Sequence, residues 1–340
     1  MILVTGANGF LGTALMRHLV ARGTKQIACL VRPGARKDKL EAMASGHPET
    51  TISVRNTGLT TASDIVPALE GVTLIYHLAA AMAGSPADMT MGTVVSSKNL
   101  LEAIAIRKSQ GHAPPRIVLV SSFGVYGVAE LPRGAIVDEE TPLEKNPQLR
   151  DPYSQSKLRQ EALFRDYEKK LNLPIVIVRP GVIYGPGGGA MSSRVGLDVF
   201  GIFLNIGRGN HLPLTYVENC ADAILAAGEN GKDGEVYNVV DDDIPTCTQY
   251  LTEYKKHVRN VPALPVPYPV AQLLSRGVSW YSKFSQGQLP AILTPYRTAA
   301  TWGGNRFDNS KMKSLGWKPL VSTHDGIAKT MEWLKANPKK

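Results

Sequence analysis

Several patterns that define whole classes of protein are scarce or absent in this sequence of 340 residues. It has only three cysteines, which are far apart and show no C-x-x-C spacing: Cys29, Cys220 and Cys247. We therefore expect reduced thiols rather than a disulfide framework, and a cytoplasmic protein. No uninterrupted apolar run reaches the roughly 18 residues that a spanning helix needs. No charged n-region precedes the first expected strand at Ile2, so no signal peptide is expected either.

The chain also lacks a clear nucleic-acid signature, although its formal net charge is +9. Lysine and arginine are scattered and form no basic stripe interleaved with aromatic residues. A solvated surface or an anionic small-molecule ligand explains the excess better than nucleic acid, and no metal site is expected. With 43% hydrophobic and 20% charged residues, the chain can form one large α/β domain and a smaller appended one.

The N-terminus carries the clearest signal that is present. Ile2–Val4 reads as a buried strand, Gly6, Gly9 and Gly12 follow at G-x-x-G-x-x-G spacing, and Thr13–Arg22 has helical periodicity. Such glycines allow a tight turn, close approach of a pyrophosphate and close helix–strand packing, and the helix N-terminus favours phosphate. The sequence therefore predicts a dinucleotide-binding loop. Its expected cofactor-binding residues are Gly6, Asn8, Gly9, Phe10, Leu11 and Gly12.

A second expected strand, Gln26–Val31, ends at Arg32, with Arg36 and Lys37 close behind. In an NAD-binding unit an acidic residue usually ends this strand and binds the ribose hydroxyls. Guanidinium groups instead suit a 2′-phosphate. We therefore favour NADP over NAD, with Arg32 and Arg36 as cofactor residues; the alternative is that these cations only solvate a surface loop.

Strands and helices alternate along the following sequence, which predicts a doubly wound parallel sheet of the Rossmann type. Small residues after the strand Val72–Leu78 would let a cofactor lie against the backbone, so Leu78, Ala79 and Ala80 are expected cofactor residues. His77 lies inside that apolar strand, and we interpret it as a core residue rather than a catalytic one. The other expected elements are strands Thr51–Val54, Arg116–Val120 and Ile175–Val178, and helices Ala62–Leu69 and Val94–Ile106.

The candidate chemistry follows the strand Arg116–Val120. Ser121 and Ser122 end this strand, and a later helix, expected to run to about Leu171, opens with Tyr153 and Lys157. An i, i+4 pair shares one helical face, and an ammonium beside a phenol favours the phenolate, which would lower the tyrosine pKa.

These motifs together resemble the extended short-chain dehydrogenase/reductases of the NAD(P)-dependent epimerase/dehydratase family. Further matching segments are His77–Ala80, Val125–Gly127, Arg179–Pro180, Tyr184–Gly187, Tyr216–Asn219 and Leu315–Trp317. The resemblance implies a catalytic triad of Ser122, Tyr153 and Lys157, and a homodimer. Tyr153 would exchange the hydroxyl proton, Ser122 would hold the reacting oxygen, and Lys157 would bind the nicotinamide ribose. Further cofactor contacts are expected from Val120, Ser121, Tyr153, Lys157, Pro180 and Val182.

Three departures from the family pattern qualify that resemblance. Thr57–Gly58 stands where many relatives have Gly-Asp, which puts the adenine contacts in doubt, and Thr93–Ser97 lacks the asparagine that often starts this helix. Phe123–Gly124 stands where 4,6-dehydratases carry Asp-Glu, so dehydration is not expected.

We expect residues 1–180, with returning segments from about 211–245, to form the Rossmann domain. Residues 181–210 and 246–340 are expected to form a smaller substrate lobe. Its apolar stretches, Val195–Ile206 and the candidate helix Val270–Phe284, are interpreted first as lobe core. A lipophilic pocket or contact with a membrane surface is the alternative.

Three functions remain open from the sequence alone. The first is hydride transfer at a secondary alcohol or ketone of a nucleotide sugar, with Ser122, Phe123 and Arg297 as substrate residues and Arg297 on the diphosphate. Many sugar epimerases have asparagine where Val182 stands, which weighs against it. The second is a 3β-hydroxysteroid or sterol dehydrogenase-like activity. The third is a non-catalytic NADP-binding sensor, which would have no need of the whole triad.

Overall fold

The computed structural model describes residues 1–284 and 293–338. Seven parallel strands form its central sheet in the order β3-β2-β1-β4-β5-β7-β12. The chain order reverses between β1 and β4, which creates the crevice where doubly wound sheets bind ligands. The predicted Rossmann-type sheet is confirmed. The strands are β1 (Ile2–Thr5), β2 (Gln26–Leu30), β3 (Thr51–Arg55), β4 (Leu74–His77), β5 (Arg116–Val120), β7 (Ile175–Pro180) and β12 (Val236–Val239).

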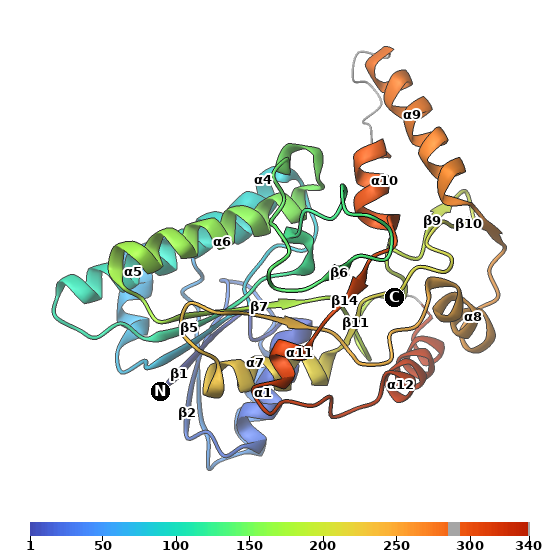
Figure 1. The fold of residues 1–340 in the computed structure, drawn as a ribbon. Helices are drawn as coiled ribbons and strands as arrows, with labels where there is room; N and C mark the ends of the chain where they lie inside the picture. Colours follow the sequence, from blue (N-terminus) through green and yellow to red (C-terminus); the bar gives the residue numbers. More distant parts are fainter. Residues whose placement is uncertain (285–292, 339–340) are drawn as a thin grey trace.

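Helices cover both faces of this sheet (Figure 1). Because neighbouring strand residues point to opposite faces, Leu3 and Val4 of β1 enter two separate apolar clusters. The cluster around Val4 lies under α1 (Phe10–Ala21), α2 (Asp38–Gly46) and α7 (Val217–Asn230). The cluster around Leu3 lies under α3 (Ala62–Ile65), α5 (Ser96–Ser109) and α6 (Pro152–Leu171).

Several elements differ from the sequence prediction. The expected helix over residues 62–69 divides into α3 and the 3₁₀-helix η1 (Val66–Leu69), which has a proline in its first turn. The helix expected from Val94 begins at Ser96 and follows α4 (Pro86–Met89) and a π-helix, η2 (Thr90–Val95). The edge strand β12 was not predicted as a strand, since its four residues carry no clear alternation.

The remaining elements form a lobe beside the carboxyl ends of the strands (Figure 1). Its small sheet, β13-β10-β9, accounts for much of the apolar stretch Val195–Ile206. The expected substrate lobe over 246–340 includes residues 285–292 and 339–340, which lie outside the described part of the chain. The lobe comprises β9 (Leu197–Val199), β10 (Ile202–Asn205), β13 (Ala263–Pro265), α8 (Cys247–His257), α9 (Tyr268–Phe284), α10 (Pro295–Trp302) and α12 (Thr323–Ala336).

Smaller elements connect these two parts. They are the strand pairs β8 (Val182–Tyr184) with β11 (Leu214–Tyr216) and β6 (Ile136–Val137) with β14 (Arg306–Phe307), the 3₁₀-helices η3 (Phe123–Val125) and η4 (Pro147–Leu149), and α11 (Ser310–Lys313). All three cysteines are buried, free thiols. None of the described helices is both long and apolar enough to cross a bilayer.

Candidate active site

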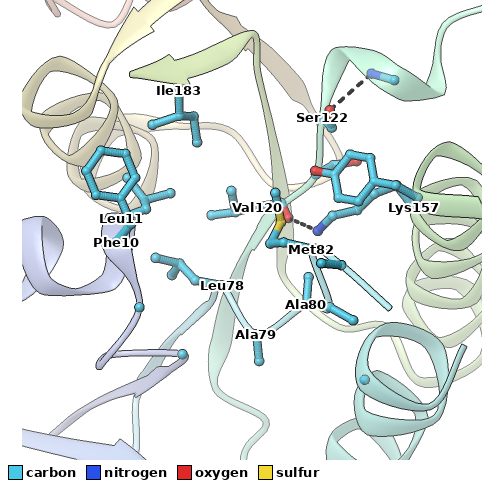
Figure 2. A pocket seen from close by; sticks show the side chains of 18 of the residues that line it. Phe10, Leu11, Leu78, Ala79, Ala80, Met82, Val120, Ser122, Lys157 and Ile183 are labelled. Atoms are coloured by element: carbon cyan, nitrogen blue, oxygen red, sulfur yellow. Dashed lines mark hydrogen bonds between the residues drawn. The ribbon is translucent and has the colours of Figure 1, made fainter. Parts of the chain in front are cut away.

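A cavity of about 1370 Å³ opens at the carboxyl ends of β1, β4, β5 and β7 and reaches to α10 in the lobe. This volume exceeds the roughly 300–1,000 Å³ typical of a site for one small molecule. It has room for a dinucleotide and a second ligand together. Figure 2 shows side chains from opposite walls, among them Phe10, Leu11, Leu78, Ala79, Ala80, Val120, Ser122, Lys157 and Ile183.

The glycine loop forms one wall of the cavity, and its geometry requires two of the glycines. Gly6 has φ +73°, and a Cβ there would stand 3.1 Å from the backbone nitrogen of Ala79. A Cβ on Gly12 would stand 2.1 Å from the carbonyl oxygen of Gly6. Gly9 is the N-cap of α1, so the free N–H groups of that helix face the cavity side of the loop.

The strand-end residues Leu78, Ala79 and Ala80 all line the cavity, as expected. Thr5 Oγ1 accepts a hydrogen bond from the Ala79 backbone N–H at 3.2 Å, which fixes this turn against β1. Thr93 Oγ1 accepts from the backbone N–H of the next residue, Ala81, at 3.0 Å. No local sequence pattern predicts this hydrogen bond of Thr93, because the bond forms only when the π-helix η2 packs beside the turn after β4.

Only one of the two expected phosphate-binding arginines lines the cavity. Arg32 is exposed and stands in the wall after β2, next to Val31. Arg36 is not among the lining residues; its backbone carbonyl accepts a hydrogen bond from Asn8 Nδ2 at 3.4 Å. The cavity lining therefore favours Arg32 over Arg36 as the phosphate-binding residue.

The three expected catalytic residues all line the same cavity. Asp151 caps α6 by accepting from the backbone N–H of Ser154 at 2.9 Å, and Pro152 occupies the first turn. This start places Tyr153 and Lys157 on the first two turns of α6. Ser122 follows β5 and accepts from the Gly124 backbone N–H at 3.1 Å.

The pKa of Tyr153 is raised, not lowered as the sequence predicted. Burial is the main cause, and Asp151 adds to it, while a hydrogen bond with Ser122 acts in the opposite direction. Burial of the phenol therefore outweighs the groups that favour the phenolate. The phenol is protonated at neutral pH.

Lys157 is buried and held by two hydrogen bonds. Its Nζ donates to the Val120 carbonyl at 2.8 Å and to Gln160 Oε1 at 2.9 Å. Gln160 Nε2 in turn donates to Ser97 Oγ at 2.8 Å. Burial lowers the pKa of Lys157 to about 8, so the ammonium form persists at neutral pH.

His77 is a core residue, as predicted. Its ring lies between Thr5 Oγ1 at 2.8 Å and Ser97 Oγ at 2.9 Å, and its side chain is fully buried. Burial, with a smaller effect of Lys157, lowers its pKa to about 3. The neutral ring completes the hydrogen-bond chain that leads to Lys157.

A buried ion pair supports α6 one turn beyond Lys157. Arg179 of β7 contacts both carboxylate oxygens of Glu161, at 2.9 and 2.7 Å. The Arg179 guanidinium also lies over the Tyr126 ring, 4.7 Å from its centroid. The motif residues Tyr126 and Arg179 therefore position the helix that carries the reactive groups, and they do not line the cavity.

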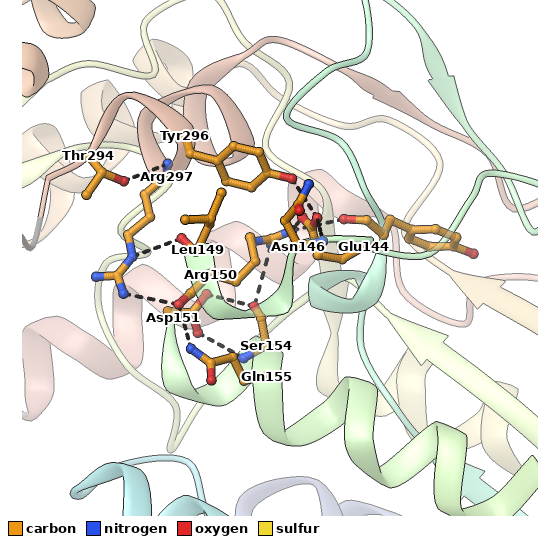
Figure 3. A network of polar contacts seen from close by, with 11 residues as sticks. Glu144, Asn146, Leu149, Arg150, Asp151, Ser154, Gln155, Thr294, Tyr296 and Arg297 are labelled. Atoms are coloured by element: carbon orange, nitrogen blue, oxygen red, sulfur yellow. Dashed lines mark hydrogen bonds and ion pairs between the residues drawn. The ribbon is translucent and has the colours of Figure 1, made fainter. Parts of the chain in front are cut away.

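Arg297 stands outside the cavity lining, so the structure does not bring this expected substrate residue together with the other site residues. Its Nε donates to the Leu149 carbonyl at 3.3 Å and its Nη2 to the Arg150 carbonyl at 3.1 Å. Figure 3 shows it joining α10 to the turn before α6. The hydroxyl of the adjacent residue, Tyr296, donates a hydrogen bond to Glu144 Oε1 at 2.5 Å.

Arg194, which sequence reasoning missed, lines the cavity from the loop between β8 and β9. Its guanidinium lies 5.8 Å from the centre of the Phe307 ring and makes no hydrogen bond or ion pair with a described residue. Burial, and then nearby Arg150, lower its pKa to about 10. Cys247 and Asp151 act in the opposite direction. A cation in the cavity wall that makes no ion pair with a described carboxylate favours an anionic ligand.

Of the other expected residues, Val120, Ser121, Phe123, Pro180 and Val182 line the cavity. Phe123 stacks on Phe307 with 5.2 Å between ring centres. The buried Oγ of Ser121 has no hydrogen-bond partner within the described part of the chain. No group of three or more His, Cys, Asp or Glu among the described residues is arranged to hold a metal.

Comparison with known proteins places this geometry in context. A family model described as the NAD dependent epimerase/dehydratase family matches residues 2–240. The chain is 25% identical over 348 residues to N-acetyl-alpha-D-glucosaminyl-diphospho-ditrans,octacis-undecaprenol 4-epimerase of Escherichia coli O157:H7, covering 100% of this chain and 96% of that protein. It is also 25% identical over 367 residues to 3beta-hydroxysteroid-dehydrogenase/decarboxylase isoform 1 of Arabidopsis thaliana. That match covers 97% of this chain and 78% of that protein.

A similar fold is found in UDP-glucose 4-epimerase of Thermus thermophilus, solved as a complex with NAD. The TM-score is 0.69 at 21% identity, and the match covers 98% of this chain and 99% of that one.

Proposed function

The chain belongs to the NAD-dependent epimerase/dehydratase family, and we propose that it transfers hydride at a secondary alcohol or ketone of a nucleotide sugar. One observation carries the proposal: Ser122, Tyr153 and Lys157 share a cavity with the glycine loop and with Arg194, whose guanidinium makes no ion pair with a described residue. A dinucleotide site, an acid–base group and an anion-binding group are therefore present together.

The residues present fit a nicotinamide dinucleotide. A Cβ at Gly6 or Gly12 would crowd the neighbouring backbone. Because both positions are glycine, the loop can keep its tight turn and leave the N-terminus of α1 open to a pyrophosphate. The buried Ser121 Oγ supplies a hydrogen-bonding group that no described residue satisfies. When bound, such a cofactor accepts or returns the hydride. We propose NADP as the preferred form, because the cation Arg32 lines the wall where an NAD site usually has a carboxylate.

The roles of the three reactive residues follow from their chemistry. Ser122 holds the reacting oxygen by hydrogen bonding, and Tyr153 exchanges a proton with it. Because burial raises the pKa of Tyr153, the phenol is ready to donate a proton during reduction of a ketone. Lys157, fixed through Val120 and Gln160, binds the ribose hydroxyls and contributes a positive charge near the phenol during oxidation.

Elimination of water is not part of the proposal. The positions that follow Ser122 are Phe123, which is buried against Phe307, and Gly124. Neither residue has an acid or base group. The protein therefore carries one acid–base residue at the reacting oxygen rather than the additional pair that dehydration needs.

Arg194 supports a substrate that carries phosphate. The glycine loop serves the cofactor's pyrophosphate, whereas Arg194 lies on the lobe side of the same cavity with Ser192 and Thr301. A nucleotide sugar brings a diphosphate, which needs a cationic partner when it leaves water. We therefore propose Arg194, rather than Arg297, as the residue that binds the substrate's diphosphate.

A lipophilic alcohol or ketone is the second candidate substrate. Met82 and Met91 line the cavity although they are 71% and 61% exposed, which gives its mouth an apolar rim. The Arabidopsis relative, by its name a hydroxysteroid dehydrogenase, is a precedent for such substrates in a similar chain. A sterol-like ligand would gain from apolar burial but would leave Arg194 unpaired.

Melting temperatures test the choice of substrate. With the cofactor site saturated, UDP, GDP or TDP is expected to raise the melting temperature of the wild type, as any ligand selective for the native state does. Arg194→Gln should lose that shift, and the matched variant Arg297→Gln should keep it. If hydroxysteroids stabilise the protein and no nucleoside diphosphate does, the nucleotide-sugar proposal is wrong.

We further propose that the enzyme acts in the cytoplasm as a homodimer. Its three buried free thiols are compatible with a reducing compartment, and the dimer rests on the family resemblance alone.

A further inference from the structure

Helix α9 exposes its large apolar side chains and buries small ones, whereas a surface helix usually turns its large apolar side chains to the core. On the side that packs against the protein, Ala271 is 1% and Ser275 0% exposed. On the outward side, Leu273 and Trp280 are each 67% exposed. The large exposed side chains of this face are Val270, Leu273, Leu274, Val278, Trp280 and Tyr281.

The small sheet, which lies at the base of α9 (Figure 1), also exposes apolar side chains. Phe200, at the turn between β9 and β10, is fully exposed, and Ile202 and Leu264 are about half exposed. Leu204 of β10 and Ala271 of α9 belong to one apolar cluster, so the sheet and the helix are packed together. We call α9 and the β9–β10 hairpin, with Leu264, the apolar surface. Contiguous surfaces of this kind mark interaction sites.

The chain that carries α9 and Leu264 contains no acidic residue, whereas the β9–β10 hairpin carries one, the exposed Asp198. Residues 254–307 include no Asp or Glu and seven of the 38 Lys and Arg residues, so they supply +7 of the net charge of +9. The remaining 31 cations and 29 acidic residues nearly cancel. The cations are therefore about as frequent in this stretch as in the whole chain, and its positive charge comes from the lack of acidic residues. Its cations are Lys255, Lys256, Arg259, Arg276, Lys283, Arg297 and Arg306.

We propose that the apolar surface docks on an anionic lipid bilayer. Arg276 is exposed on α9, at the border of the apolar face that carries Leu273 and Trp280. A helix with one wide apolar face, tryptophan and tyrosine on it and only cationic charge beside it is suited to lie in the headgroup region. Anionic headgroups attract each nearby lysine or arginine.

A second copy of the chain fits this surface less well than lipid does. Pairing two copies through the same face would bring together two regions whose cations outnumber their one acidic residue, Asp198, and like charges across an interface oppose association. The docked helix α9 packs against α10, whose Ala300 and Thr301 line the cavity. A bilayer held against α9 therefore lies one helix away from the cavity wall.

Co-sedimentation of the full-length protein with vesicles tests the proposal. We expect binding to vesicles of phosphatidylcholine with phosphatidylglycerol, and roughly tenfold weaker binding to phosphatidylcholine alone or at high salt. The double variant Leu273→Glu/Trp280→Glu should bind anionic vesicles at least roughly tenfold more weakly than the wild type. The matched control is Leu320→Glu, at a site that is 58% exposed and outside the apolar surface.

Melting temperature and cofactor binding of each variant establish that it is folded. The proposal is overturned if the wild type ignores anionic vesicles, or if the folded double variant binds them as well as the wild type does. Loss of a dimer in the double variant, measured by light scattering and without vesicle binding by the wild type, would assign the face to a second copy and also overturn it.

Discussion

Cofactor choice depends at the residue scale on the guanidinium of Arg32, which lines the cavity after β2. Replacing it with aspartate puts a negative charge where the proposal has a 2′-phosphate. We expect Arg32→Asp to weaken NADP by at least the roughly 1.5–3 kcal/mol of a charged hydrogen bond. Binding titrations with NADP and NAD measure this, and NAD should lose little.

Arg36→Asp is the matched control, since Arg36 belongs to the same loop but does not line the cavity. Its effect on NADP should be clearly smaller than that of Arg32→Asp. A wild type that prefers NAD, or equal losses of both cofactors in Arg32→Asp, would contradict the assignment of the 2′-phosphate.

Single residues differ in how far the sequence could predict their place in the site. Gly6, Gly12, Tyr153 and Lys157 follow from local spacing beside a strand or along a helix, whereas Ser122 was identified through the family resemblance. Arg297 and Arg194 do not follow in this way. Whether a guanidinium meets a carbonyl or an open cavity depends on how α10 and the β8–β9 loop pack, which no local pattern records.

At the scale of elements, the buried pair Glu144–Arg150 holds the segment before α6 together, and Tyr296 of α10 donates a hydrogen bond to the same Glu144. The pair therefore anchors this segment to α10. Arg150 Nη1 donates to Glu144 Oε2 at 3.1 Å, and both side chains are buried. Hydrogen bonds from Tyr296, Asn146 and Arg150 overcome the effect of burial and hold the pKa of Glu144 below its usual value. Removing the carboxylate leaves a buried arginine unpaired.

We therefore expect Glu144→Gln to lower the free energy of unfolding by about 3–5 kcal/mol. Because the pKa of Glu144 is lower in the folded state, its stabilisation is complete above the unfolded pKa of about 4.5 and is lost as the pH falls through the folded pKa. The difference between wild type and variant should shrink accordingly in acid. Urea unfolding at several pH values measures both effects.

Asp166→Asn removes an exposed ion pair with Lys170 on the same helix, at 2.7 Å, and serves as the control. It should cost less than about 1 kcal/mol. A Glu144→Gln protein as stable as this control would contradict the anchoring role of the pair.

The boundaries of a helix or strand were predictable where the sequence carries a clear local signal. The start of α6 follows from Asp151 and Pro152, a cap and a first-turn proline. The π-helix η2 could not be predicted, because the hydrogen bond that Thr93 Oγ1 accepts from the Ala81 backbone N–H joins segments that meet only in the folded protein. The strand β12 is too short to show alternation, and parallel pairing with β7 defines it.

At the scale of the whole molecule, the sequence predicted the sheet and left the lobe undetermined. Buried parallel strands are near-continuous apolar runs followed by glycine or small residues, which the sequence displays directly. The lobe consists of short strands and helices whose apolar residues serve either as core or as surface. Leu273 of α9 and Leu204 of β10 look alike in sequence, and only packing separates the exposed one from the part-buried one.

The central claim is that this molecule transfers hydride between a nicotinamide cofactor and a nucleotide sugar, with Tyr153 exchanging the proton at the reacting oxygen. The most direct measurement mixes the cofactor-loaded protein with a panel of nucleotide sugars and follows the reduced nicotinamide and the product in a single turnover. We expect turnover by the wild type and by Tyr167→Phe, a tyrosine of α6 outside the cavity lining. Tyr153→Phe should be slower by roughly 10²–10⁴-fold with cofactor affinity unchanged. Turnover by Tyr153→Phe at the wild-type rate, or wild-type turnover of hydroxysteroids and of no nucleotide sugar, would contradict the claim.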